Sequence, residues 1–155
     1  MLSRLKNFGE AVAASITSFS SLPASFAYLP DMYTIPDGGG VIVSPVSHTM
    51  TPEARGVWRE SFSVQAVILA VVTSANNEDV DAYSEIAESI KDAFLGGFVE
   101  TESESYRVES VISSGNTILS SSQIEGGVID SKILGESCIV QIPVIIEADR
   151  FIEES

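Results

Sequence analysis

The sequence contains only one cysteine, only one histidine, and only 8 basic residues against 22 acidic ones. The single cysteine, Cys138, cannot form an internal disulfide and has no Cys or His neighbours at metal-binding spacing, which favours a reducing compartment. We expect Cys138 to be a small buried apolar residue in a strand. The formal charge of −14 argues against a large phosphate-binding face, because such a face gains its affinity from Lys and Arg.

Long apolar runs are also missing, and no segment approaches the roughly 18 apolar residues of a membrane span. Arg4, Lys6 and the alanines after them resemble the start of a signal peptide, but Gly9 and Glu10 interrupt it and no continuous apolar core follows. We therefore expect a cytoplasmic chain with no membrane partner. No segment repeats at a fixed period, so we expect residues 1–155 to form a single domain.

Hydrophobic periodicity predicts two helices and one long strand. Apolar residues at steps of three and four predict a helix over about 2–18 and another over about 78–95, the second with capping residues at its start and Gly96-Gly97 at its end. Apolar and polar residues alternate from Trp58 to Val72, which predicts a strand over about 58–72. At roughly 3.3 Å per residue this strand would reach about 50 Å, so it should extend beyond the core.

Shorter segments complete the predicted fold. Extended stretches around 26–34 and 40–46, separated by the turn-forming residues 36–40, predict a first hairpin. Residues 106–112 and about 137–148 predict two further strands, and the Ser/Gly-rich stretch about 113–135 predicts a loop or mobile hairpin between them. We expect an α/β chain of the α+β kind. Its mixed, mostly antiparallel sheet should carry two helices on one face, in the order helix, hairpin, long strand, helix, strand, strand.

Catalytic chemistry has few candidate residues in this sequence. A Ser-His-Asp or Cys-His arrangement would have to use His48, which lies in a polar connection over 47–52 and which we interpret as a solvated loop histidine. Gly38 to Gly40 lack the Lys-Ser/Thr of a phosphate loop and precede a strand, so they predict a turn. We therefore predict no catalytic residues, no cofactor site and no metal site, and a protein that is not an enzyme.

One candidate contact surface is acidic. Glu100, Glu102 and Glu104 alternate with threonine and serine, so in an extended segment their carboxylates would lie along one side. Such a row makes a poor metal site, because it points along a line and not around a centre. Two interpretations stay open: a solvated sheet edge that discourages stray strand pairing, or a row of charges facing the lumen of a ring.

A second candidate contact surface lies at the start of the long strand. Trp and Arg are favoured at protein interfaces, because they bury a large area while keeping a polar group available. Trp58, Arg59 and Phe62 are therefore candidates for a subunit interface. A core position for Trp58 is the alternative, because this residue alternates in phase with Phe62 and Val64.

Three segments resemble the tail terminator (tail completion) proteins of long-tailed bacteriophages. They are Gly56 to Gln65 (GVWRESFSVQ), Asp79 to Ile90 (DVDAYSEIAESI), and the last strand through Ile139 to Glu147. In that family a long strand of this kind is followed by an acid-capped amphipathic helix and a closing strand, and an N-terminal helix precedes them. The resemblance spans most of the chain, carries no signature motif and leaves out Ser113 to Gly135.

The resemblance implies a virion structural protein of the tail and neck that assembles in the host cytoplasm. Its copies would form a hexameric ring that caps the tail tube and ends tube polymerisation. The ring would also contact the neck or head-completion protein, and DNA would pass through its acidic lumen without specific binding. Two other interpretations stay open: another neck or head-completion connector subunit, and a small enzyme or ligand-binding α/β domain.

Overall fold

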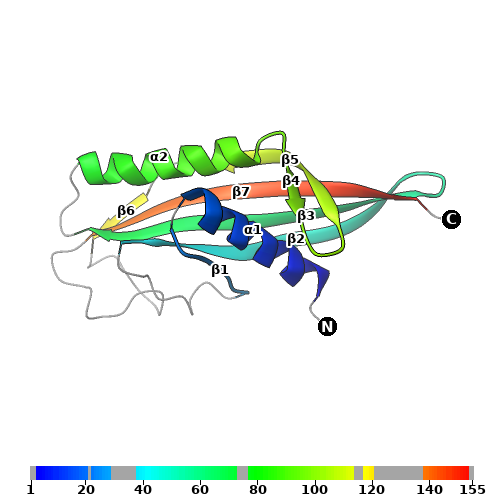
Figure 1. Cartoon of the computed structure of the whole chain (residues 1–155), viewed down its shortest axis with the longest axis horizontal. Helices are drawn as coiled ribbons and strands as arrows, with labels where there is room; N and C mark the ends of the chain where they lie inside the picture. Colours follow the sequence, from blue (N-terminus) through cyan, green and yellow to red (C-terminus); the bar gives the residue numbers. More distant parts are fainter. Residues whose placement is uncertain are drawn as a thin grey trace.

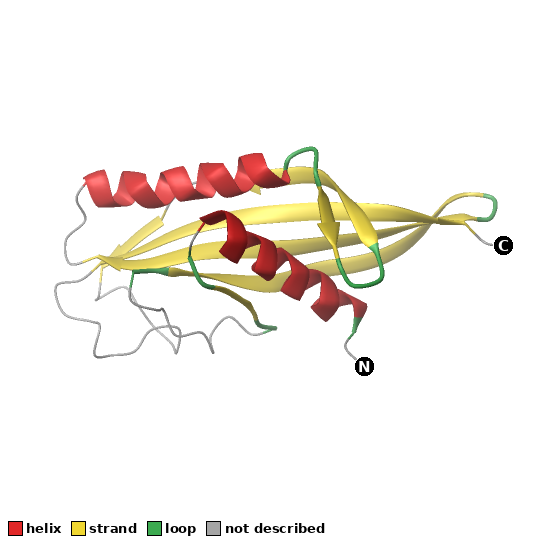
Figure 2. Ribbon diagram, viewed as in Figure 1, coloured by secondary structure: helices red, strands yellow, loops and turns green. Residues whose placement is uncertain are grey.

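The computed structural model describes residues 3–20, 22–28, 38–72, 77–113, 117–120 and 138–153. The chain is an α+β protein, as predicted, and Figures 1 and 2 show an elongated sheet with both helices on one side. The elements in chain order are α1 (Arg4–Ser20), β1 (Ala24–Phe26), β2 (Gly40–Ala54), β3 (Val57–Val72), α2 (Asn77–Phe94), β4 (Phe98–Glu100), β5 (Ser105–Ser113), β6 (Thr117–Ser120) and β7 (Cys138–Glu153).

The sheet has the strand order β1-β2-β3-β7-β5-β4, and β6 also pairs with β7. All described strand pairs are antiparallel except β1 and β2, which are parallel. This corrects the predicted pairing of 26–34 with 40–46 as a hairpin, because β2 forms its hairpin with β3. Residues 29–37 of that prediction lie outside the described part of the chain.

The predicted polar connection at 47–52 is part of β2, which continues to Ala54. It remains a strand because β3 pairs with it along its whole length. The register shifts between Pro45 and Ser47 and again between Pro52 and Ala54. Such bulges accommodate prolines, which have no amide hydrogen for the ladder.

Both helices pack on the same face of the sheet. Phe8, Val12 and Ile16 form the buried stripe of α1, and Ile90 and Phe94 belong to the buried stripe of α2. These side chains meet the alternating apolar residues of the strands in a single core cluster, which includes Val41, Val43, Phe62, Val64, Ala66, Ile68, Tyr106, Val140, Ile142, Val144 and Ile146. Neither described helix is long and apolar enough to cross a membrane.

The second helix ends as the sequence predicts. Gly96 adopts a φ of 73°, a left-handed conformation that favours glycine at the end of a helix. The Gly97 amide donates to the carbonyl of Phe94 at 3.1 Å. This stop turns the chain into β4, and β4 pairs with β5.

Three strands are much longer than the rest: β2 has 15 residues, and β3 and β7 have 16 each. The hairpin of β2 and β3 and the end of β7 extend past both helices, as Figure 1 shows at the end that carries the C-terminus. We call residues 49–59 and 151–153 the arm. Every residue of β2 from Val46 onward is exposed, so the arm lies outside the core.

The predictions for the C-terminal half have mixed outcomes. The last strand runs to Glu153 instead of about 148, because it follows β3 as far as Val57. Most of the predicted loop or hairpin at 113–135 lies outside the described residues, although β6 within it pairs with β7. Cys138 begins β7 as predicted for a strand residue, but the burial of its side chain also lies outside what the structure describes.

Candidate functional site

Adjacent side chains of β3 point to opposite faces of the sheet, as in any strand. Glu60 and Phe62 lie on the face that carries the helices and are buried. Arg59 and Ser61 lie on the opposite face, which we call the far face, and line a concave surface there. The two faces therefore carry different sets of side chains.

The buried carboxylate of Glu60 is the centre of an ion cluster on the helix face. Its side chain is 0% exposed. Arg4 of α1 donates to its two oxygens through Nη2 and Nε, each at 2.7 Å. Arg150 of β7 donates through Nε at 2.9 Å, and the hydroxyl of Tyr106 donates at 3.0 Å. His48 Nε2 lies 2.9 Å from Oε2. We call these five residues the ion cluster.

The ion cluster fixes the charge of Glu60. Desolvation by burial raises the pKa of this carboxyl, but hydrogen bonds from Arg4, Arg150, His48 and Tyr106 outweigh that effect and lower the pKa to about 2. Desolvation and the hydrogen bond to Glu60 raise the pKa of Tyr106. Glu60 is therefore an anion at neutral pH with its oxygens occupied, which suits the fastening of α1 to the sheet and not proton transfer.

His48 belongs to this cluster and is a strand residue, so the loop part of its prediction is wrong, while its side chain stays 31% exposed, in keeping with the solvated part. It lies in β2, and its ring stacks on Phe62 with the centroids 4.2 Å apart. Its Nε2 faces Glu60. The Glu60 carboxylate is a poor base, because its pKa is about 2. The alternation of β2 opposite β3 brings His48 and Phe62 together, since they are direct partners in the register.

Glu104 forms an outer layer of the ion cluster. Its Oε2 lies 2.6 Å from Arg150 Nη1, and its Oε1 lies 3.8 Å from Arg4 Nη2. The predicted row of Glu100, Glu102 and Glu104 is therefore broken. Glu100 ends β4, and the chain then turns, with the amide of Thr101 donating to the carbonyl of Glu104 at 2.9 Å. Glu100 and Glu102 remain exposed.

The three candidate interface residues, Trp58, Arg59 and Phe62, do not lie together on one exposed surface. Phe62 is 1% exposed and stacks on Phe8 with the centroids 4.7 Å apart, so the structure removes it from the candidate subunit interface. Trp58 is half-buried on the helix face of the arm, in phase with Phe62 as the sequence indicates. Arg59 lies on the far face, where its Nε is 3.0 Å from Glu53.

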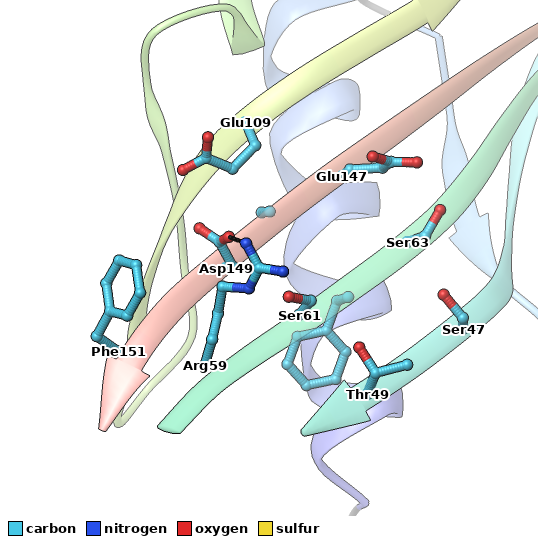
Figure 3. A pocket seen from close by; sticks show the side chains of 11 residues that line it. Ser47, Thr49, Arg59, Ser61, Ser63, Glu109, Glu147, Asp149 and Phe151 are labelled. Carbon is cyan, nitrogen blue, oxygen red and sulfur yellow. Dashed lines mark ion pairs between the residues drawn. The ribbon is translucent and has the colours of Figure 1, made fainter. Parts of the chain in front are cut away.

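The far face of the sheet carries a polar trough near the base of the arm. It has a volume of about 470 Å³, and strands β2, β3, β5 and β7 line it. Figure 3 shows Asp149 beside Arg59 in this trough, Glu109 next to them, Glu147 farther along near Ser63, and Phe151 at the end toward the arm tip. The hydroxyl residues that line it are Ser47, Thr49, Ser61 and Ser63. We call this concave surface the trough.

Two carboxyl groups interact inside the trough. Desolvation by burial, then the hydrogen bond and charge of Glu109, raise the pKa of Asp149 to about 6. Arg59 opposes this shift only weakly, because its Nη1 lies 3.9 Å from Asp149. The trough thus holds more negative charge than its own arginine neutralises.

Known proteins add no assignment to this geometry. No family model matches the chain, and no curated protein matches it. The described residues contain no group of three or more His, Cys, Asp or Glu side chains arranged to hold a metal ion. The ion cluster, the trough and the arm are therefore the features that bear on function.

Sequence reasoning missed the ion cluster, although one signal for it is present. Glu60 is the only charged residue among the even positions from 58 to 72, and those positions form the apolar face of the strand. A charge in phase with an apolar face predicts a buried ion, which must have partners. The identity of those partners could not be predicted, because Arg4 and Arg150 lie 56 and 90 residues away.

Replacing Asp149 with asparagine should stabilise the protein above pH 6. The folded state holds the pKa of Asp149 at about 6 instead of 3.8, so ionisation of Asp149 costs stability as the pH rises through 6. Since one pKa unit corresponds to about 1.4 kcal/mol, the variant should gain about 1 to 3 kcal/mol at pH 8 and nothing below pH 3.8. Urea unfolding at both pH values measures this. An equal gain in stability at both pH values would contradict the prediction. The control is Glu147→Gln, which changes an exposed carboxylate of the same strand.

Proposed function

We propose that this protein is a virion structural subunit, a tail terminator that forms a hexameric ring on the end of a phage tail tube. The observation that carries the proposal is the arm: three long strands continue beyond the helix-covered core, and the β2 part of the arm is exposed throughout. Strand extensions of this kind contribute little to the core of a single chain. They supply a stiff surface for contacts between copies.

The order of elements supports the same proposal. An N-terminal helix, a 16-residue strand, a helix and a closing 16-residue strand occur in this order as α1, β3, α2 and β7, with the other strands between them. This is the order that the resemblance to tail terminator proteins implies. We assign no catalytic role, because the one histidine and its carboxylate partner belong to the saturated ion cluster.

Ring closure needs a contact between two different surfaces of the subunit, repeated until the rotation closes. In the described part of the chain, β2 has a neighbour on its outer edge only along residues 41–43. Pro45 and Pro52 interrupt the remaining edge, and proline discourages uncontrolled strand pairing because it cannot donate. The subunit can therefore present an edge to a defined neighbour without aggregating.

Charge supports the proposed passage of DNA. Each copy carries a formal charge of −14, and a negative lumen wall repels the phosphate backbone, which lets DNA pass without binding. Glu100 and Glu102 are exposed and stay candidates for the lumen wall. Glu104 stays a candidate as well, although its pairing with Arg150 neutralises part of its charge.

Native mass spectrometry of the purified protein, alone and after mixing with tail tubes, tests this function. We expect hexamers, or monomers that become a cap at one end of the tube in negative-stain images. A hexamer that binds the neck protein and ignores the tube would favour the neck-connector alternative. A monomer that ignores tubes would contradict the proposal and favour the ligand-binding alternative.

A further inference from the structure

The tip of the arm carries an exposed cation. Arg55 and Gly56 form a two-residue connection between Ala54 and Val57, which pair with each other. Gly56 has a φ of 76°, and a Cβ built on it would meet nothing within 4 Å, so this side of the turn is open. Arg55 is exposed, and no described carboxylate forms an ion pair with it.

The trough has the chemistry that recognises a guanidinium group. Glu109, Glu147 and Asp149 supply carboxylates, and carboxylates bind the planar arginine fork through paired hydrogen bonds. Hydroxyl side chains from β2 and β3 supply further acceptors. Phe151, 61% exposed, offers an aromatic face beside them, on which a guanidinium can stack.

Four other described cations are less well placed to enter the trough of another copy. Arg107 lies on the far face itself, as the direct β5 partner of Asp149 in the register. Lys91 lies in the last turn of α2, on the opposite face of the sheet. Arg4 and Arg150 are held in the ion cluster. Arg55 is carried beyond the core by paired strands, so it can reach a second molecule.

We propose that Arg55 at the arm tip of one copy seats in the trough of the next copy, between Asp149, Glu109 and the ring of Phe151. This contact rests on the proposed ring and specifies which surfaces join its subunits. It is heterologous, because tip and trough are different surfaces, and so it can repeat around a ring. The paired strands of the arm are ordered before assembly, which lowers the entropic cost of the contact.

The electrostatics of the trough support this arrangement. Burial and Glu109 oppose the ionisation of Asp149 within one chain. An arginine arriving from a second chain would favour the ionised form and relieve the repulsion between the two carboxyl groups. Exclusion of water around the contact would strengthen the attraction further.

Chemical cross-linking between two differently labelled chains tests the contact directly. Cys138 is replaced by serine in every chain, since it is the only cysteine. One chain then carries Arg55→Cys and the other Ser61→Cys, so a cross-link between them is intermolecular by construction. A short bismaleimide reagent replaces a disulfide, because the long arginine side chain keeps the two backbones apart. The control chain carries Ser89→Cys on the exposed face of α2.

Charge reversal tests the energetics of the same contact in the full chain. We expect Arg55→Glu to weaken self-association about tenfold or more, because it places like charges together. The double variant Glu109→Lys/Glu147→Lys should weaken it similarly, and combining all three changes should restore it. Lys91→Glu, with the same change of charge on the opposite face, should have little effect. Circular dichroism checks that each variant folds, and sedimentation velocity measures association.

The possible outcomes distinguish failure of this contact from failure of the proposed ring. Cross-linking of 55 with 61 but not with 89, together with rescue by charge reversal, supports the contact. Rings or tube caps that form normally with Arg55→Glu, or that cross-link 55 to 89, overturn the contact and leave the tail terminator proposal standing. An unaltered chain that stays monomeric both in solution and in the presence of tube ends overturns both.

Discussion

Replacing Glu60 with glutamine is expected to lower the free energy of unfolding at pH 7 by about 3 kcal/mol. The variant keeps the size of the side chain but leaves Arg4 and Arg150 without their shared anion. Both arginines keep some contact with water and with Glu104, which limits the loss. Urea unfolding followed by circular dichroism measures the change, and Ser61→Ala, the neighbour on the far face, is the control.

The pH dependence gives this prediction a signature that simple loss of packing would not produce. The folded state lowers the pKa of Glu60 from 4.5 to about 2. A lowered pKa stabilises the fold above the unfolded value of 4.5, and that stability is lost as the pH falls through 2. The difference between wild type and Glu60→Gln should therefore shrink from pH 5 to pH 2. A difference that stays constant across this window would show that the charge of Glu60 is not what stabilises the fold.

The ion cluster also explains an unfavourable feature of α1. The first turn of this helix contains no acidic residue and instead carries Arg4 and Lys6. Positive charge near a helix N-terminus opposes the helix dipole and costs a few tenths of a kcal/mol or more. The two hydrogen bonds from Arg4 to Glu60 offset that cost. They also attach the start of α1 to the base of the arm, which links the helix layer to the proposed assembly surface.

The parts of the fold that local patterns determine could be predicted from the sequence. The stripe of Phe8, Val12 and Ile16 defines α1, and the alternation beginning at Trp58 defines β3, because each pattern reports which side of one element is buried. The packing of β1 against α1 could not be predicted in this way. Gly9 lies so close to β1 that a Cβ on it would be 2.2 Å from the ring of Phe26. That contact between helix and strand leaves no local signal.

The candidate site shows the same limit more strongly. The polar residues of 47–52 suggested a loop, and only the pairing with β3 and its two bulges makes this segment a strand. The trough brings together residues of four strands that lie far apart in the sequence. Their charges are visible in the sequence, but their shared face depends on a strand order in which β7 lies between β3 and β5.

Replacing Phe62 with alanine is the second large effect that we expect, a loss of about 3 to 5 kcal/mol in the free energy of unfolding. Phe62 is 1% exposed and has aromatic contacts with Phe8, His48 and Tyr106. Truncation would leave a cavity beside the ion cluster and remove the surface on which the His48 ring stacks. The urea midpoint should fall accordingly, with an unchanged slope.

Phe151→Ala is the matched control, because it removes the same side chain from the same sheet on the opposite face. Phe151 is 61% exposed, so its loss should change the unfolding free energy by no more than about 0.5 kcal/mol. It should instead weaken self-association, since the ring of Phe151 forms part of the proposed seat for Arg55. If both alanine variants lowered stability equally, the division into a structural helix face and an assembly surface on the far face would be wrong. If Phe62→Ala alone destabilises the fold and Phe151→Ala alone impairs association, the two faces of one sheet carry separate tasks.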